Sequence, residues 1–216
     1  MKILCAIKNA FNAYKKAFDI TKPTEELFKA FTNSLDNELK SYEIVYDYIC
    51  GKDTVNVDGH TNGYYLKKGD AIIMDISVCH EGKWNDVTRT YFVGEPTAEQ
   101  KNAYELIKNS LKAGESVLKH GALACDIYNA VNGVFKEKGK TLIHHAGHVI
   151  AKEVITQPQF LKENTGNVSN GDIVAIESGL YSGFGIRLEN NYLITENGAQ
   201  NLFEHLMPLN IEDYVL

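Results

Sequence analysis

Apolar residues recur at every third or fourth position in the N-terminal part of the chain, which is the period of an amphipathic helix. The pattern predicts one helix over residues 3–18 and a second over residues 26–39. Pro23 lies between them and separates the two helices, because proline lacks the backbone N–H that a continuing helix needs. The chain therefore opens with two helices that each bury one face.

A second pair of helices is predicted in the middle of the chain. Thr97 and Gln100 have the spacing of a capping box, and helical periodicity continues from there to about Lys119. A further amphipathic helix is predicted from about Cys125 to Lys138.

Two hairpins are predicted from runs of β-branched and aromatic residues. Residues 71–78 and 87–93 form the first hairpin, and residues 172–178 and 185–195 form the second around the glycine-rich YSGFG. A further strand is predicted near residues 141–146.

This order of elements predicts the domain organisation. Two helices and a hairpin, followed by two more helices and a second hairpin, are typical of one α+β domain with a mainly antiparallel sheet and pseudo-symmetric halves. No proline- or serine-rich linker marks a boundary, so we expect residues 1–216 to form a single domain without a separate N-terminal domain.

Acidic residues interrupt the apolar strands. Asp75 lies inside AIIMDISV, and a charge in such a strand needs a partner. A turn centred between His80 and Glu81 would place Asp75 opposite Asp86, with their Cβ atoms roughly 5 Å apart.

The second hairpin repeats this arrangement. Glu177 lies inside IVAIES, and a turn centred on Gly183 places it opposite Glu189. A single acid in a strand could face solvent, but two pairs of like carboxylates in a half-buried sheet repel each other unless cations are supplied. Arg187 alone provides too little positive charge, so a pair of divalent ions is the simplest supply.

Three histidines in HHAGHVI are candidates for joining these acids. His144 and His148 are four residues apart and share a face whether the segment is extended or helical, whereas we expect His145 to point elsewhere and to be structural. His60 is a further candidate, because it lies in a glycine-rich loop that leads to the Asp75 strand. The other histidines are expected to have ordinary core or surface roles: His80, His120 and His205.

The composition is that of an ordinary globular protein, with 216 residues, 44% hydrophobic and 23% charged, and a net charge of −6. A chain of this length can bury a core without a metal, so a metal site here indicates function. The lack of a Lys/Arg cluster argues against nucleic acid or an anionic membrane as a partner. No apolar run has membrane-spanning length, and four scattered cysteines without a CxxC pair favour reduced thiols in a cytoplasmic protein. We expect a monomer or a homodimer.

Three segments resemble those of the pita-bread metallopeptidases, which include methionine aminopeptidase, aminopeptidase P, prolidase and the metal-free creatinase. They are KKGDAIIMDISVCHEGKWNDVTRTYFVGEPT, GHVI and IVAIESGLYSGFGIRLENNYLITENG. The resemblance extends from the first helix to about residue 203. It implies the pita-bread fold, in which helices cover a curved, pseudo-symmetric sheet.

The resemblance also implies a set of five metal ligands. Asp75 would chelate one ion, Asp86 and Glu189 would bridge two, and His148 and Glu177 would complete the second. Oxygen-rich ligation with one imidazole suits manganese or cobalt, and the donor types also allow zinc or iron.

Within the family, DVTRT, ESGLY and GIRLE resemble the prolidase and aminopeptidase P branch. This likeness implies a short peptide substrate with proline in second position, cleaved by a hydroxide that two metal ions share. Glu177 would carry the proton to the leaving nitrogen, and His60 and His144 would stabilise the intermediate or the leaving group. Arg187 would order Glu189 or meet a substrate carboxylate, or else be a solvated strand residue.

The segment after the ligand histidine departs from the family. Ile155 stands where relatives have a second histidine, and Val149 and Ala151 replace glycines, so side chains enter the substrate region. Losing one donor to the transition state costs about 2 to 4 kcal/mol, which makes weak or redirected activity credible. The alternative function is a catalytically weak or inactive domain that binds peptides or proteins. The five polar ligands favour a metallohydrolase, because each is costly to bury unfilled.

Overall fold

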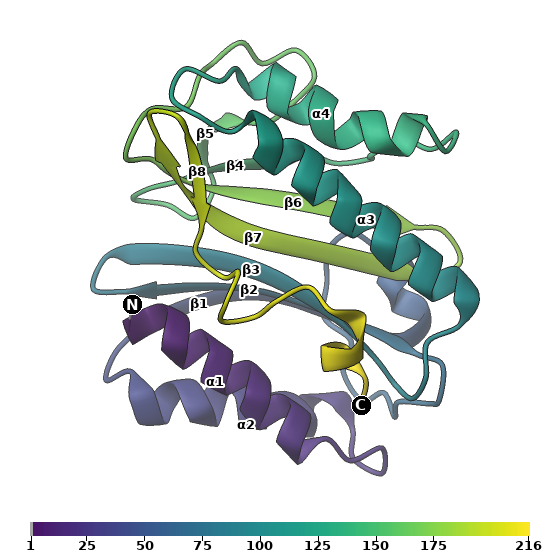
Figure 1. Cartoon of the computed structure of the whole chain (residues 1–216). Helices are drawn as coiled ribbons and strands as arrows, with labels where there is room; N and C mark the ends of the chain where they lie inside the picture. Colours follow the sequence, from purple (N-terminus) through teal and green to yellow (C-terminus); the bar gives the residue numbers. More distant parts are fainter. Residues whose placement is uncertain (1) are drawn as a thin grey trace.

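The computed structural model describes residues 2–216 and contains two antiparallel sheets, each with its own pair of helices (Figure 1). The helices are α1 (Lys2–Ala17), α2 (Thr24–Glu38), α3 (Ala98–Val117) and α4 (Ala124–Lys136). The strands are β1 (Glu43–Cys50), β2 (Ala71–His80), β3 (Lys83–Phe92), β4 (Gly147–Ile150), β5 (Thr156–Gln159), β6 (Ile173–Tyr181), β7 (Gly185–Thr195) and β8 (Gly198–Asn201). The first sheet has the order β1-β2-β3, and the second has the order β5-β4-β6-β7-β8.

All four predicted helices and both predicted hairpins are confirmed, and with them the α+β class. The strand predicted near residues 141–146 is wrong, because strand β4 begins only at Gly147. In the predicted segment the backbone has other partners, and the Leu142 N–H donates to the Asn132 side chain at 2.9 Å. Strand β1 was not predicted, because its sequence EIVYDYIC lacks a clean alternation of apolar and polar residues. Among the helices of the described residues, none is long and apolar enough to cross a lipid bilayer.

The register of the first hairpin differs from the prediction by two residues. The turn is formed by residues 81 and 82, whose φ angles of 54° and 73° are both positive, as in the two-residue turns that fit the twist of a hairpin. Asp75 therefore lies opposite Thr88, and Asp86 lies opposite Ser77. Because side chains alternate between faces with a period of two, this shift leaves Asp75 and Asp86 on the same face.

The second hairpin has the predicted register. Glu177 lies opposite Glu189, and Gly183 is in the turn with a φ of 78°. Both hairpins therefore present acidic residues from neighbouring strands.

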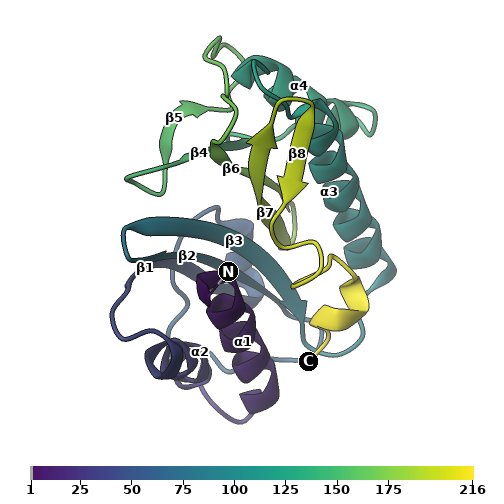
Figure 2. The same cartoon turned by 60° about the vertical axis from the view of Figure 1, so that its left-hand side comes forward.

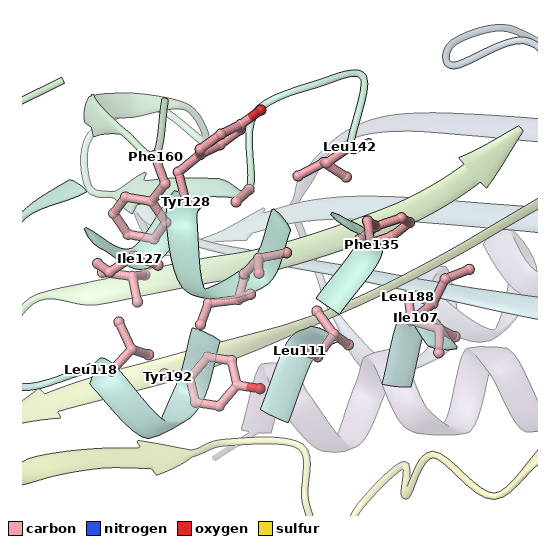
Figure 3. Close-up of a cluster of buried hydrophobic side chains, with 14 of the residues drawn as sticks. Ile107, Leu111, Leu118, Ile127, Tyr128, Phe135, Leu142, Phe160, Leu188 and Tyr192 are labelled. Atoms are coloured by element: carbon pink, nitrogen blue, oxygen red, sulfur yellow. The ribbon is translucent and has the colours of Figure 1, made fainter. Parts of the chain in front are cut away.

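Each sheet has its own hydrophobic core. Helices α1 and α2 pack beneath the β1–β3 sheet, and α3 and α4 cover the sheet that contains β6 and β7 (Figures 1 and 2). In the second core, Ile107 and Leu111 of α3 and Phe135 of α4 pack with Leu188 of β7 (Figure 3). Because each half buries its own apolar face, the boundary between the two sheets is free to be polar.

Strands β3 and β7 run side by side at this boundary, but side chains rather than a backbone ladder join them (Figure 1). Three of the links are the Asp86 N–H to Asn191 Oδ1 at 3.0 Å, Thr88 Oγ1 to Glu189 Oε2 at 2.8 Å, and Thr90 Oγ1 to the Arg187 carbonyl at 2.8 Å. Successive links advance by two residues in opposite directions along the two strands, as in an antiparallel pair. We call this boundary the seam.

Arg89 stabilises the seam through hydrogen bonds to both strands. Its side chain is fully buried, and its guanidinium donates hydrogen bonds to five acceptors. These acceptors are the carbonyls of Thr88, Glu189 and Met207, Oδ1 of Asn190 and the hydroxyl of Tyr214. The residue thus ties β3 and β7 to the C-terminal segment.

Replacing Arg89 with Met should lower the free energy of unfolding by about 3–5 kcal/mol, because buried acceptors lose their donor. Urea denaturation followed by circular dichroism measures the change. Lys119→Met, which removes an exposed cation, is the matched control and should stay within about 0.5 kcal/mol of the parent protein. Equal stability of the two variants would contradict the role assigned to Arg89.

Candidate metal centre

A cavity of about 170 Å³ lies along the seam, and acidic and imidazole side chains line it. Its lining includes all five predicted ligands, Asp75, Asp86, His148, Glu177 and Glu189, together with His144, Arg187 and Ile155. The sequence did not indicate the further polar residues Asp47, Asp58 and Ser77 or the inward placement of His145. A larger cavity of about 750 Å³ lies between α3, α4 and the β6–β7 turn, but the described residues that line it include no His, Cys or Asp.

Three of the predicted ligands converge on one point. Donor atoms of Asp86, His148 and Glu189 all lie within 4.8 Å of one another, and His148 Nε2 is 3.4 Å from Asp86 Oδ2. All three side chains are buried. Two carboxylates and one imidazole facing a common space are a donor set that fits a divalent transition metal ion.

Hydroxyl groups hold the two acids of this group in place. Ser77 donates to Asp86 Oδ1, and Thr88 donates to Glu189 Oε2, each at 2.8 Å. Each carboxylate keeps its other oxygen for a ligand. Hydrogen bonds of this kind commonly orient the ligands of a metal.

Asp75 has a different partner in this structure. Its Oδ2 lies 2.6 Å from an Arg187 terminal nitrogen, which is also 3.1 Å from Asp47 Oδ2. Asp47 lies directly opposite Asp75 on β1. Like Asp75, Asp47 is an acid inside a strand, EIVYDYIC. It was not predicted as a site residue, because strand β1 was not predicted. Arg187 therefore bridges two acids rather than ordering Glu189.

Glu177 is flanked by two histidines. His145 Nδ1 is 3.0 Å from Glu177 Oε1, and His144 Nδ1 is 3.7 Å from Oε2. His144 Nε2 also lies 3.3 Å from the hydroxyl of Tyr181. The prediction that His145 points elsewhere was wrong.

The cause of this placement is Gly147. Its φ of 134° interrupts the strict alternation on which the prediction relied, and a Cβ at this position would lie 2.0 Å from the Ala175 carbonyl oxygen. Only glycine lets the chain approach β6 this closely. The kink turns the segment before β4 so that His144, His145 and His148 all reach the cavity.

The structure does not bring His60 to this cavity. Its side chain is exposed and packs edge-on against Tyr46, with ring centroids 4.7 Å apart, where it borders a separate surface cavity. Of the three residues that depart from the family pattern, only one lies at the site. Ile155 lines the site, whereas Val149 belongs to the core under α3 and α4, and Ala151 is exposed.

Burial and mutual repulsion shift the titration of these acids. Burial, together with the charges of Asp86 and Glu177, raises the pKa of Asp75 to about 8 even though Arg187 opposes the shift. Burial and neighbouring acids also hold the pKa of Glu189 well above its usual value. Burial, the largest single influence, would raise the pKa of Glu177, but His145, His144 and Arg187 together outweigh it and the pKa is lowered. The cluster therefore carries more potential negative charge than Arg187 can balance.

The chain is similar to known metallopeptidases. The family model described as Metallopeptidase family M24 matches residues 2–196. An uncharacterized peptidase of Methanocaldococcus jannaschii is 31% identical over 96% of this chain and 64% of its own length. The Xaa-Pro dipeptidase of Pyrococcus furiosus is 28% identical over 69% of this chain and 47% of its own length.

The fold is also shared with solved structures. The X-Pro aminopeptidase of Thermotoga maritima superimposes with a TM-score of 0.91 at 22% identity, covering 100% of this chain and 62% of that structure. This likeness confirms the pita-bread fold. The chain thus spans less than two thirds of the length of each of these proteins.

Metal binding at pH 7 should release protons, because a pKa of about 8 leaves the Asp75 carboxyl largely protonated in the metal-free protein. An ion binds the ionised carboxylate, so about one proton leaves Asp75 per chain and the apparent affinity rises as the pH approaches 8. Titration calorimetry with Mn²⁺ in buffers of different ionisation enthalpy measures the release. Binding heats that do not depend on the buffer would contradict the expectation.

Proposed function

We propose that this chain, which belongs to metallopeptidase family M24, is a peptidase that uses two divalent ions to hydrolyse N-terminal peptide bonds before proline. The observation that carries the proposal is the convergence of Asp86, His148 and Glu189 on one point of a buried cavity. The buried carboxylates need cations, and the seam leaves their free oxygens facing the same space.

Under this proposal, Asp86, Glu189, His148 and Glu177 would hold one ion. Asp75 would hold a second together with Asp86 and Glu189, and for this it would have to leave its contact with Arg187. Manganese or cobalt suits these oxygen-rich donors. Bound ions would supply an activated water and polarise the scissile carbonyl.

The side chains around the cavity would perform the proton transfers. Glu177 stays ionised because its pKa is lowered, so it can accept a proton from the attacking water and deliver it to the leaving nitrogen. His144 donates through Nδ1 to the His145 carbonyl at 2.6 Å, which leaves Nε2 to accept from Tyr181. If the Tyr181 O–H turned away from His144 Nε2, it would be free to donate to the charge that develops on the substrate.

The cavity favours a small substrate with an apolar ring. Its volume is about 170 Å³, and aliphatic side chains form part of its wall. These are Val45, Val57, Val154 and Ile155. Together with the likeness to an Xaa-Pro dipeptidase, this wall supports Xaa-Pro dipeptides or short Xaa-Pro peptides as the substrate class.

The chain loaded with Mn²⁺ or Co²⁺ should release the N-terminal residue from Ala-Pro and from Ala-Pro-Ala faster than from Ala-Ala or Met-Ala-Ser. In Glu189→Gln, kcat/KM should fall by more than the roughly 10²–10³-fold that loss of one oxyanion donor costs. Glu163→Gln, which changes an exposed loop acid, is the matched control and should retain full activity. Release of amino acids by chromatography measures the rates.

Two results would overturn parts of the proposal. Hydrolysis of Met-Ala-Ser alone would remove the preference for proline. Binding of Ala-Pro by metal-loaded protein without hydrolysis of any of the four peptides would favour the alternative function, a peptide-binding domain that has lost catalysis.

A further inference from the structure

We infer that His145 is an additional ligand of the metal centre and binds through Nδ1 beside Glu177. The inference rests on the proposed metal-dependent function, because it concerns the ligands of the same centre. It adds a second imidazole to the one that His148 provides.

The first argument is the contact between His145 and Glu177. His145 Nδ1 lies 3.0 Å from Glu177 Oε1, yet this nitrogen is buried and has no hydrogen-bond partner within residues 2–216. At such a short distance, a missing hydrogen bond means that the ring nitrogen is not aimed along the line to the oxygen. Both atoms are close together while each remains available to a third atom.

This spacing is that of two donors on one ion. Two ligand atoms with bonds of about 2.1 Å and an angle near 90° lie about 3.0 Å apart. With the same bond lengths, the 3.4 Å between His148 Nε2 and Asp86 Oδ2 corresponds to an angle of about 108° at the ion. His145 lies outside the group of three donors that are within 4.8 Å of one another, but its ring centroid is 5.7 Å from that of His148, so a turn of the ring would bring it towards the same ion.

His144 is the neighbour that could compete for this role, but its nitrogens are already used. Its Nδ1 donates to the His145 carbonyl at 2.6 Å, and its Nε2 contacts the Tyr181 hydroxyl at 3.3 Å. Of the two, His145 alone has a buried nitrogen without a hydrogen-bond partner within residues 2–216, and this nitrogen lies 3.0 Å from Glu177 Oε1. His145 is therefore assigned as the ligand, and His144 as the residue that forms hydrogen bonds.

A second imidazole changes which metals the site prefers. Affinity for nitrogen donors rises from Mn²⁺ through Fe²⁺ to Co²⁺, whereas carboxylates suit manganese. The wild-type chain should therefore bind Co²⁺ over Mn²⁺ by a larger ratio than a variant that lacks the His145 imidazole.

The experiment loads the protein with one equivalent of Co²⁺ and counts the bound imidazoles by X-ray absorption fine structure. The wild-type chain should show two imidazoles per ion, and His145→Ala and His148→Ala should each show one. His144→Ala is the matched control and should still show two. Removing a residue that only hydrogen-bonds to a metal ligand lowers metal affinity roughly 10–100-fold. Removing a ligand should cost at least as much, so the Co²⁺ affinity of His145→Ala, measured by calorimetry, should fall at least ten-fold.

The outcomes separate this inference from the proposed function. One imidazole in the wild-type chain with bound Co²⁺ would overturn the role of His145 and leave the metal-dependent peptidase intact. No bound Co²⁺ at all would overturn both. The wild-type count decides the inference even if a variant fails to fold.

Discussion

The site depends on one structural constraint, which is that side chains and not a backbone ladder join β3 to β7. Thr88 and Thr90 reach across the seam to Glu189 Oε2 and the Arg187 carbonyl, so the two backbones stay farther apart than paired strands. That separation gives acids from both hairpins room to face each other. Arg89 stabilises this arrangement by donating hydrogen bonds to the Thr88 carbonyl of β3 and the Glu189 carbonyl of β7.

This constraint has an electrostatic consequence. The seam buries Asp75, Asp86, Glu177 and Glu189 close together, while a single guanidinium, that of Arg187, faces them within the described residues. Proton uptake can relieve the repulsion in part. The raised pKa of Asp75 reflects both its burial and this repulsion. Bound divalent ions would relieve the repulsion further and favour the ionised acids. The separate core in each half makes this arrangement tolerable, because the fold does not rely on the seam for apolar burial.

Much of the site could be predicted from the sequence, because the period of a strand fixes which residues share a face. The register predicted for Asp75 was wrong by two residues, yet the acids still met, since an even shift preserves the face. Asp47 and His145 could not be placed in this way. Asp47 lies on a strand without clear alternation, and His145 precedes a glycine whose positive φ breaks the period. Backbone kinks and edge strands are set by tertiary packing, which local patterns do not record.

The account rests on the claim that the seam is a metal centre, and crystals grown with Mn²⁺ test this claim most directly. Anomalous diffraction at the manganese edge should show a peak within about 2.1–2.3 Å of the donor atoms of Asp86, His148 and Glu189, and a second peak beside Asp75. Arg187 should then have released Asp75. Crystals with no anomalous peak in the cavity, and with Asp75 still paired to Arg187, would contradict the account.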